Sequence, residues 1–410
     1  MSVHEDVLSR LDSELDWLRG LYTDLHRHPE LSLEEHRTST LVEEHLASFG
    51  FDVILAGGTG VVGVLANGAG PVVLARADMD ALPVTEATGL PYSSEVDGVM
   101  HACGHDVHVA ALLGAAKLMA EGREHWAGTY IALFQPGEEV GAGAQAMVDD
   151  GLVGKLPRPD VALAQHVMPL PTGMLATATG PVLSAGDSIR ITVYGAGAHG
   201  SMPQLSVDPV VLASAIVLRL QTIVSRETRP GQFAVVTVGA LNAGTKSNII
   251  PDQATLLLNV RSYDNELRTR VLASIERIVA GECAAAGSPR EPSFEPYDQF
   301  PLTSNDAAVT ERVTDAFIAH FGAEKVSRAD PQTASEDFSR IPEAFGVPYT
   351  FWFLGGIDAE LYRAALENGT LARDIPANHS PRFAPVIDPT LSIGVQAQVI
   401  AALSYLARQE

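Results

Sequence analysis

Hydrophobic and polar positions follow two different rhythms in the first part of the chain, and each rhythm predicts its own kind of element. In the first fifty residues, apolar side chains recur at helical spacing, as at Leu8, Leu11, Leu15 and Leu18. From residue 52 onwards, short apolar runs predict buried strands. These runs are FDVIL, VVGVLA, VVLARAD, TYIALFQ and DVALAQH, and they alternate with helical stretches such as HVAALLGAAKLMAEG. The alternation predicts an α/β sheet covered by helices on both faces.

A different order of elements follows between residues 186 and 298. SIRITVYG alternates as a half-exposed strand, and DPVVLASAIVLRLQTIVSR has a helical pattern. Two strands, GQFAVVTVGAL and QATLLLNVRSY, come next, followed by the helix ELRTRVLASIERIVAGECAAAG and the strand-like EPSFEPY. The order β-α-β-β-α-β predicts a ferredoxin-like α+β unit. We therefore expect an α/β main domain in two parts, residues 1–185 and 299–410, with a ferredoxin-like domain inserted at 186–298.

Composition narrows the classes of protein to consider. With 46% hydrophobic and 19% charged residues among 410, the chain can bury large cores. Its formal charge of -23 disfavours a nucleic-acid partner, which requires clustered cations. Only two cysteines, Cys103 and Cys283, are present, so we expect reduced thiols and a cytoplasmic location. We expect neither a signal segment nor a membrane span, because the amino terminus is charged and no apolar run reaches about 18 residues.

Three of the strand-like runs end in polar side chains. VVLARAD delivers Asp78 and then Asp80, YIALFQPGEE delivers Glu138 and Glu139, and VALAQH delivers His166. In parallel α/β sheets, ligands bind beyond the carboxyl ends of the strands. The sequence therefore predicts that these groups converge on one pocket.

The two adjacent glutamates need a break in the strand to act together. Neighbouring residues of a strand point to opposite faces, which would separate the carboxylates. Pro136 and Gly137 precede the pair and predict a turn on which Glu138 and Glu139 both sit. The alternative is a solvated acidic turn, which is common in proteins.

The segment MHACGHDVH carries five polar or ligating side chains just before a helical run. They are His101, Cys103, His105, Asp106 and His108. A thiolate and an imidazole at i and i+2 in a loop suit a transition metal. The alternative is a polar helix entrance with Asp106 as its N-cap. The density of ligands favours the metal site.

Two further histidines and one glycine motif are ambiguous when taken alone. His199 lies among small residues in YGAGAHGSMP, and His379 lies in PANHSPRF; each is most simply a loop residue. Residues 58–63 fit G-x-G-x-x-G, but the following VVGVLANG predicts a strand instead of the helix that a dinucleotide site requires. We therefore expect no dinucleotide site there.

Taken together, the motifs resemble those of the M20 metallopeptidase family. The resemblance is closest to its amidohydrolase branch of hippurate hydrolases, N-acyl-amino-acid amidohydrolases and plant auxin-conjugate hydrolases. The matching segments are LHRHPELS (25–32), RADMDALP (76–83), MHACGHDVH (100–108), FQPGEE (134–139), AQHV (164–167), GAGAHGSMP (195–203), SNIIPD (247–252), SEDFS (335–339) and NHSPRF (378–383). They span nearly the whole chain in the order of the family.

The resemblance implies a catalytic domain with two divalent metal ions and an inserted satellite domain that serves as a lid and for dimerisation. Carried over by motif, the metal ligands are Cys103, His105, Glu139, His166 and His379. Glu138 takes the role of general base. Where many relatives have a ligand histidine this chain has Arg76, and Asp78 is left to orient a metal-bound imidazole.

The inserted domain is implied to contribute substrate contacts. His199 would stabilise the oxyanion, within one chain or across a dimer, and Asn248 and Arg261 are weaker candidates for substrate binding. Many members of the branch read HGAxPH where this chain reads HGSMPQ. Gln204 thus leaves details of the acyl pocket or lid open, but changes no metal ligand.

These features predict a metal-dependent amidohydrolase acting on N-acyl amino acids or similar small conjugates. The thiolate favours zinc and the carboxylates also admit manganese, with nickel or cobalt as further options. A homodimer or a higher homo-oligomer, formed through the satellite domain, is expected. The alternatives are a metal-dependent dipeptidase or carboxypeptidase, and a non-catalytic protein that binds conjugates. Glu138 argues against the last, because a binding protein needs no base.

Overall fold

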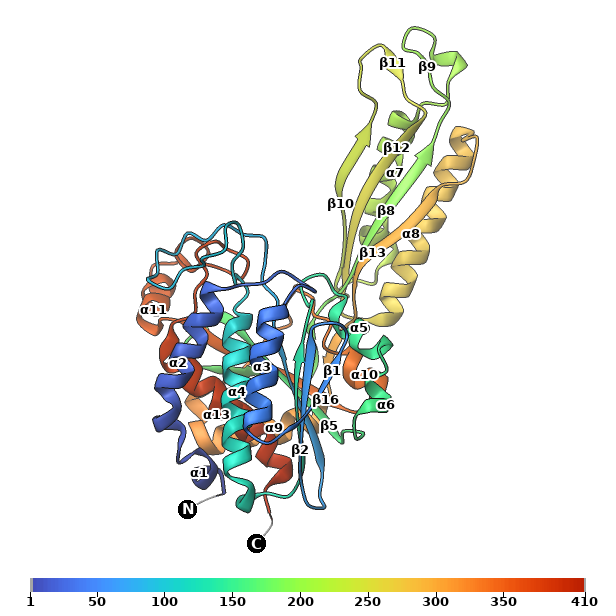
Figure 1. The fold of residues 1–410 in the computed structure, drawn as a ribbon. Helices are drawn as coiled ribbons and strands as arrows, with labels where there is room; N and C mark the ends of the chain where they lie inside the picture. Colours follow the sequence, from blue (N-terminus) through green and yellow to red (C-terminus); the bar gives the residue numbers. More distant parts are fainter. Residues whose placement is uncertain (1–2, 409–410) are drawn as a thin grey trace. The chain divides into compact units, whose positions relative to one another are not determined.

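The computed structural model describes residues 3–408 and contains two compact units (Figure 1). The first unit comprises residues 1–182, 304–331 and 337–410 of the chain, as far as they are described. The second comprises Leu183–Thr303 and also Gln332–Glu336, a short segment that the sequence pattern did not assign to it. Each unit is described below by itself.

The first unit is built on one mixed sheet of eight strands in the order β1-β2-β4-β3-β5-β16-β6-β15. The strands are β1 (Asp52–Ala56), β2 (Gly60–Asn67), β3 (Val72–Asp78), β4 (Gly128–Gln135), β5 (Val161–Pro171), β6 (Leu175–Thr177), β15 (Val326–Arg328) and β16 (Tyr349–Ile357). Its centre, β4-β3-β5-β16, is parallel, whereas β1 and β2 form an antiparallel hairpin that pairs with β4. The expected mixed α/β architecture is confirmed.

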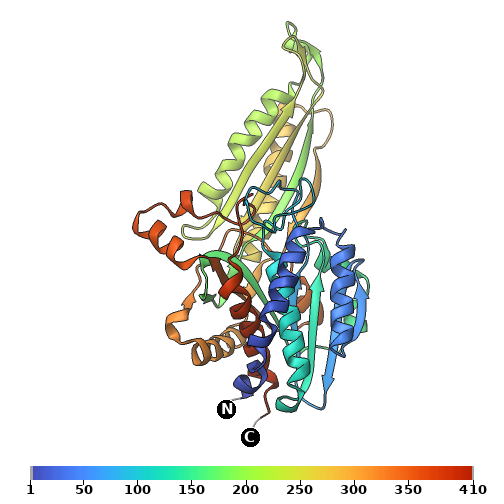
Figure 2. The ribbon, with the colours of Figure 1, turned by 60° about the vertical axis from the view of Figure 1, so that its left-hand side comes forward.

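Helices cover both faces of this sheet, as the continuous apolar runs of its central strands require. On one face lie α2 (Leu11–Arg27), α3 (His36–Ser48), α4 (His105–Glu121), α9 (Ala307–Phe321) and α13 (Ile387–Leu406), with α1 (Val3–Leu8) packed against α4 and α13 (Figures 1 and 2). On the other lie α5 (Gly143–Asp149), α6 (Leu152–Lys155) and α10 (Arg340–Phe345). The short helices α11 (Ala359–Glu367) and α12 (Leu371–Asp374) follow β16. The helix α4 is buried along almost its whole length, so its polar first turn is held inside the unit.

The second unit has the element order that the sequence predicts for residues 186–298. Its elements are β8 (Ala185–Tyr194), α7 (Pro209–Thr222), β10 (Ala234–Ala243), β12 (Gln253–Ser262), α8 (Asn265–Ala286) and β13 (Ser293–Phe300). The four strands are antiparallel in the order β10-β12-β8-β13, the ferredoxin-like arrangement, and both helices pack on one face. Aspartates cap the two helices: Asp208 at α7 and Asp264 at α8.

Two points of sequence interpretation are resolved by the fold. The G-x-G-x-x-G stretch at 58–63 forms the turn into β2 and the start of that strand, as expected, so no helix opens there. Two helical segments, Pro209–Glu227 and Ile387–Leu406, are long and apolar enough to cross a membrane by composition alone. The second of them is α13, which is mostly buried as a core helix of the first unit.

Candidate active site

The carboxyl ends of β3, β4 and β5 bring the polar strand ends together. β3 lies between β4 and β5, and Asp78 at its end is level with Gln135 at the end of β4. His166 lies on β5, two residues beyond Ala164, which pairs with Arg76. After Gln135 the strand gives way to the Pro136–Gly137 turn. The structure therefore places Asp78, the glutamate pair and His166 at one edge of the sheet.

Five side chains from distant parts of the chain meet at this edge. Cys103 Sγ lies 3.5 Å from His166 Nε2. Glu139 approaches two imidazoles, with His379 Nε2 at 3.3 Å from Oε2 and His105 Nε2 at 3.9 Å from Oε1. Ligand atoms of Cys103, His105 and Glu139 all lie within 4.8 Å of one another. The thiol, three imidazoles and one carboxylate form a single cluster inside the first unit.

Two of these imidazoles are oriented by backbone carbonyls. His105 Nδ1 donates to Asp80 O at 2.8 Å, and His166 Nδ1 donates to the carbonyl of its neighbour Val167 at 2.8 Å. A proton fixed on Nδ1 leaves Nε2 with its lone pair directed away from the backbone. Both Nε2 atoms face the cluster and are suited to bind a cation.

His108, in contrast, has both ring nitrogens engaged. Its Nε2 accepts a hydrogen bond from Val167 N at 2.8 Å, so Nδ1 carries the proton and donates to Asp78 Oδ1. The other oxygen of Asp78 accepts from Arg76 Nη1 at 2.6 Å. Burial alone would raise the pKa of Asp78, but the charges of Arg76 and the neighbouring imidazoles hold it well below its usual value. Asp78 is thus an ionised, hydrogen-bonded carboxylate behind the cluster.

The segment that carries His379 is held in an unusual backbone conformation. His379 has a φ of +69°, in the left-handed region, and its N–H donates to Ala102 O at 2.8 Å. The side chain of Asn378 donates to Cys103 O at 3.1 Å and to Val167 O at 3.2 Å. Asn378 therefore connects three parts of the cluster. Sequence reasoning missed this residue, and its only signal was its place beside His379 in NHSPRF.

The cluster has the electrostatic properties of a cation site. Hydrogen bonds that His379 makes to Cys103 and Glu139 raise its pKa to about 10, so these groups favour a positive charge between them. Burial, and then the charge of Glu139, raise the pKa of the Cys103 thiol. Within residues 3–408, the buried atoms His105 Nε2 and Glu139 Oε1 make no hydrogen bond of good geometry. The residues present therefore fit a transition metal bound by sulfur, nitrogen and oxygen.

Glu138 and Glu139 both lie on the turn after β4, as the sequence predicts. Glu139 N donates to Asp80 Oδ2 at 3.0 Å, and the same oxygen accepts from Ser32 Oγ at 2.7 Å. Glu138 is only 5% exposed and lies next to the cluster in sequence without being one of the five donors. The turn therefore offers one carboxylate to the cluster and carries a second, buried one at the preceding position of the chain.

The three remaining candidates belong to the second unit. His199 lies on the short strand β9 (Ala198–His199), which pairs with β11 (Ile249–Ile250), and Asn248 O accepts from Gly200 N at 2.8 Å. Both side chains are exposed. Arg261, on β12, is half-buried and donates to Asn259 at 2.9 Å and to Ser335. His199 and Asn248 are thus brought together on one hairpin pair, whereas Arg261 lies elsewhere in the unit.

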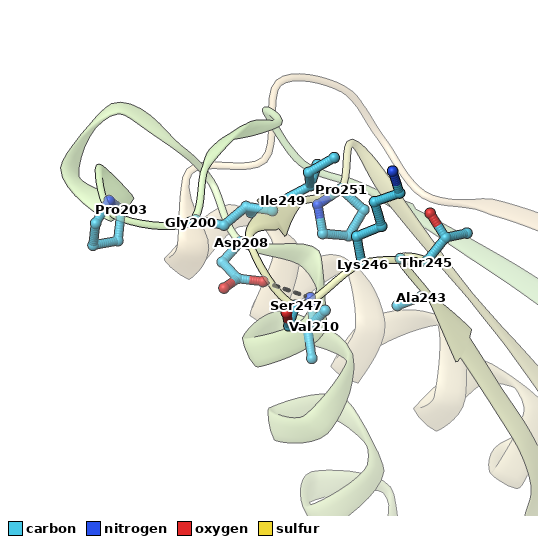
Figure 3. A pocket seen from close by; sticks show the side chains of 12 residues that line it. Gly200, Pro203, Asp208, Val210, Ala243, Thr245, Lys246, Ser247, Ile249 and Pro251 are labelled. Atoms are coloured by element: carbon cyan, nitrogen blue, oxygen red, sulfur yellow. Dashed lines mark hydrogen bonds between the residues drawn. The ribbon is translucent and has the colours of Figure 1, made fainter.

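A pocket of about 570 Å³ lies beside this hairpin pair, entirely within the second unit (Figure 3). Its lining includes Lys246, Ser247 and Ile249, together with Asp208 and Val210 from the start of α7. Asp208 is engaged in capping α7, accepting from Val210 N at 2.9 Å. The pocket's lining has no cluster of metal-ligating side chains, so its chemistry differs from that of the first unit.

Comparison with known proteins gives a consistent result. Residues 74–371 match the sequence profile of peptidase family M20/M25/M40. N-acetyl-L-cysteine deacetylase of Bacillus subtilis is 39% identical over 351 residues, 85% of this chain and 82% of the relative. Thermostable carboxypeptidase 1 of Saccharolobus solfataricus is 34% identical over 410 residues, 98% and 99% of the two chains. The solved structure of the Bacillus subtilis YXEP protein, described as a dinuclear metal binding peptidase from the M20 family, superposes with a TM-score of 0.77 at 29% identity, covering 96% and 99%.

Proposed function

The chain belongs to peptidase family M20/M25/M40 and is a metal-dependent amidohydrolase, and we propose that it cleaves the amide bond of N-acyl amino acids or similar small conjugates. The observation that carries the proposal is the cluster of five donors, together with the second buried carboxylate, Glu138, which precedes Glu139 in the same turn. A protein that only bound conjugates would have no use for that second carboxylate. The related deacetylase supports an acylated amino acid as substrate.

We infer that the cluster holds two divalent ions through Cys103, His105, Glu139, His166 and His379. When bound, such ions act as Lewis acids that polarise a carbonyl group and lower the pKa of a water molecule. The mixed sulfur, nitrogen and oxygen set suits zinc, and manganese, nickel or cobalt are alternatives. Asp78 keeps a supporting role, because both of its oxygens are already occupied by His108 and Arg76.

Glu138 is proposed as the general base. Its carboxylate takes a proton from the attacking water and later delivers it to the leaving amine, so that the carboxylate is regenerated at the end of each cycle. The turn that carries it is anchored at Glu139 N by Asp80, which limits how far the base can drift. Burial in the first unit keeps bulk water from competing for the proton.

His199 is proposed to stabilise the charge that develops on the carbonyl oxygen. Its Nδ1 accepts from Ser201 N at 3.2 Å, which places the proton on Nε2. An exposed Nε2–H is a suitable donor for an oxyanion. Mixing two inactive variants, one altered in the first unit and one altered in the second, tests whether His199 serves its own chain or a partner chain, because activity returns only if the site is shared between chains. Asn248 and Arg261 are proposed as weaker substrate contacts on the same unit.

A homodimer through the second unit is the proposed assembly. On α7, Val211 and Leu218 are 66% and 74% exposed, and their spacing of seven residues puts them on one face of the helix. β10 is an edge strand of the four-stranded sheet. An exposed apolar helix face beside an unpaired strand edge suits a symmetric contact between two copies. A cytoplasmic location is inferred from two buried, unpaired cysteines.

The related carboxypeptidase supports a second candidate function, cleavage of peptides at their carboxyl-terminal residue. A substrate panel separates the two. Acetyl-, benzoyl- and indoleacetyl-amino acids are compared with unblocked dipeptides of the same carboxyl-terminal residue, each with zinc and with manganese. We expect turnover of the acylated compounds. Hydrolysis restricted to the unblocked dipeptides would replace the proposal by the peptidase function, and tight binding of conjugates with no hydrolysis by any metal form would contradict both.

A further inference from the structure

The turn before α3 makes an unusual set of contacts with the turn that carries Glu138. Glu35, the residue immediately before α3, is 0% exposed, although the loop that carries it lies at the surface. Its Oε1 accepts from Gly137 N at 2.8 Å, and this contact joins two turns 102 residues apart. The same oxygen accepts from Leu33 N at 2.8 Å, and Oε2 accepts from Thr59 Oγ1. Every one of these residues belongs to the first unit.

The local backbone is strained where this contact forms. Leu33 has a φ of +67°, in the left-handed region that a branched side chain rarely adopts. This conformation directs its N–H to Glu35 and stacks its side chain against Gly137. A Cβ built on Gly137, which has a φ of +53°, would lie 2.6 Å from Leu33 Cδ2. Strain of this kind persists only where surrounding contacts impose it, and it is often found at functional sites.

Glu138 therefore stands between two anchored amides. The amide before it, Gly137 N, is bound by Glu35, and the amide after it, Glu139 N, is bound by Asp80. Buried carboxylates that accept backbone N–H groups form strong hydrogen bonds and fix the peptide planes they contact. The peptide between these two amides is held at the carbonyl of Gly137, which accepts from Gly143 N at 3.0 Å, so Glu138 has little backbone freedom. The anchor at Asp80 is tied to the metal cluster through Glu139 and His105, whereas the anchor at Glu35 is not.

We propose that Glu35 is a positioning residue that holds the Glu138 turn in its productive conformation through Gly137 N. The inference rests on the proposed role of Glu138 as the general base. A displacement of about 1 Å of a reacting group can lower a rate by about a hundredfold. Loss of the Glu35 contact should therefore reduce kcat while substrate binding and metal binding remain.

The first test compares Glu35→Ala with Glu35→Gln in the full-length, metal-loaded protein. In the glutamine variant Oε1 can still accept from Gly137 and Leu33, and Nε2 can donate to Thr59 Oγ1. We expect kcat to fall by roughly tenfold to a hundredfold in Glu35→Ala, with KM within about twofold, and to stay within about threefold of wild type in Glu35→Gln. The metal content per chain, measured by elemental mass spectrometry, should be equal in wild type, Glu35→Ala and Glu35→Gln.

Glu30→Ala is the matched control. Glu30 lies in the same loop, and its side chain caps α3 by accepting from Arg37 N and Thr38 N at 2.8 Å each, whereas it makes no hydrogen bond to the Glu138 turn within residues 3–408. If Glu35 served only to anchor α3, both alanine variants would have a lower free energy of unfolding, and their kcat values would be equal. A selective loss of kcat in Glu35→Ala would support the positioning role. Equal kcat values in the two variants would overturn it.

Hydrogen exchange of the peptide covering residues 134–143 provides a readout that needs no substrate. We expect faster exchange there in Glu35→Ala than in wild type and Glu35→Gln. If Glu35→Ala does not fold, Glu35→Asp is used, since its shorter side chain withdraws the carboxylate from Gly137. Unchanged exchange, or faster exchange with an unchanged kcat, would overturn the proposal. Absence of any hydrolysis by the wild-type protein would instead reject the proposed function, and the exchange result would still decide whether Glu35 holds the turn.

Discussion

Arg76 Nη1 lies 2.6 Å from Asp78 Oδ2, and neither side chain is exposed to solvent. The two residues are separated by one position on β3, so they point to the same face of the sheet. The guanidinium also donates to Gln135 Oε1 at 2.9 Å, and Asp78 accepts from His108 on its other oxygen. The buried positive charge of Arg76 and the buried negative charge of Asp78 thus compensate each other behind the cluster of five donors. The charge of Arg76 thus helps to hold the pKa of Asp78 well below its usual value, against the effect of burial.

Replacing Arg76 by methionine should leave Asp78 as an uncompensated buried charge. Removal of one partner from such a pair typically costs about 3–5 kcal/mol. We expect a decrease of that size in the free energy of unfolding, measured by urea titration. Arg363→Met is the control, because Arg363 and Glu360 form a solvent-exposed pair at 3.4 Å. There the change should stay below about 0.5 kcal/mol. Equal decreases in the free energy of unfolding at the two sites would contradict the conclusion that Arg76 compensates the buried charge of Asp78.

Glu138→Gln should abolish most activity without removing the metals. The amide keeps the shape of the side chain but cannot accept and return a proton, and loss of a general base typically costs 10²–10⁴ in rate, so we expect a fall in kcat of about that size. The metal content should equal that of wild type, since Glu138 is not among the five donors. Glu367→Gln, an exposed carboxylate on α11, serves as the control. Activity of Glu138→Gln within about tenfold of wild type would remove the base assignment.

The two cysteines allow a paired test of the metal cluster. Both are buried and unpaired, but Cys103 lies in the cluster and Cys283 lies in the core of the second unit. Cys103→Ala should lower the metal content per chain, because a thiolate donor is lost. Cys283→Ala should retain the metal content of wild type. Element-specific mass spectrometry after dialysis gives both values, and identical metal contents would show that Cys103 is not a ligand.

The sequence predicted the parts of the site that depend on strand order. Asp78, Glu138 and His166 each follow an apolar strand run, and the carboxyl ends of neighbouring parallel strands necessarily meet. The break at Pro136 likewise predicted that the two glutamates share a turn. These inferences needed only local patterns and one general property of α/β sheets.

Other parts of the site depend on contacts between distant residues, which no local pattern reveals. Asn378 reaches Cys103 across 275 residues of sequence, and Glu35 reaches Gly137 across 102. The spacing of the histidines around His105 also gave no physical reason to treat them differently, and His105 was selected as a ligand only through the family resemblance. Only the structure shows that His108 uses both nitrogens while His105 keeps one free. The left-handed backbone at His379 was equally hidden, because it follows from the surrounding contacts.

The pair formed by His26 and Asp106 should make stability depend on pH. Burial lowers the pKa of His26, but its contacts with Asp106, at 2.6 Å, and Glu86 outweigh this and raise it to about 9. The folded pKa thus exceeds the usual value of 6.5, so the stabilisation is complete below pH 6.5 and is lost as the pH rises through 9. On the acid side, the pKa of Glu86 is lowered to about 2, so its contribution is present above pH 4.5 and is lost as the pH falls towards 2.

We therefore expect the difference in unfolding free energy between wild type and His26→Gln to shrink between pH 6.5 and 9. The change should be on the order of 3 kcal/mol, the equivalent of the pKa difference. His28→Gln, at the partly exposed end of the same helix, is the control and should show no comparable trend. A difference for His26→Gln that stays constant or grows over this range would contradict the assignment of a charged, buried imidazole.

Leu218 offers a direct test of the proposed dimer. The side chain is 74% exposed on α7, and in a symmetric contact a substitution there acts twice, once from each copy. Leu218→Lys should place two ammonium groups in an apolar contact, which is costly, and should therefore yield monomers. Leu366→Lys, at a 57% exposed leucine of α11, introduces the same charge in the first unit. Light scattering at micromolar concentration should give half the wild-type mass for Leu218→Lys alone. A wild-type protein that is already monomeric would exclude the dimer and, with it, any role of His199 in a partner's site.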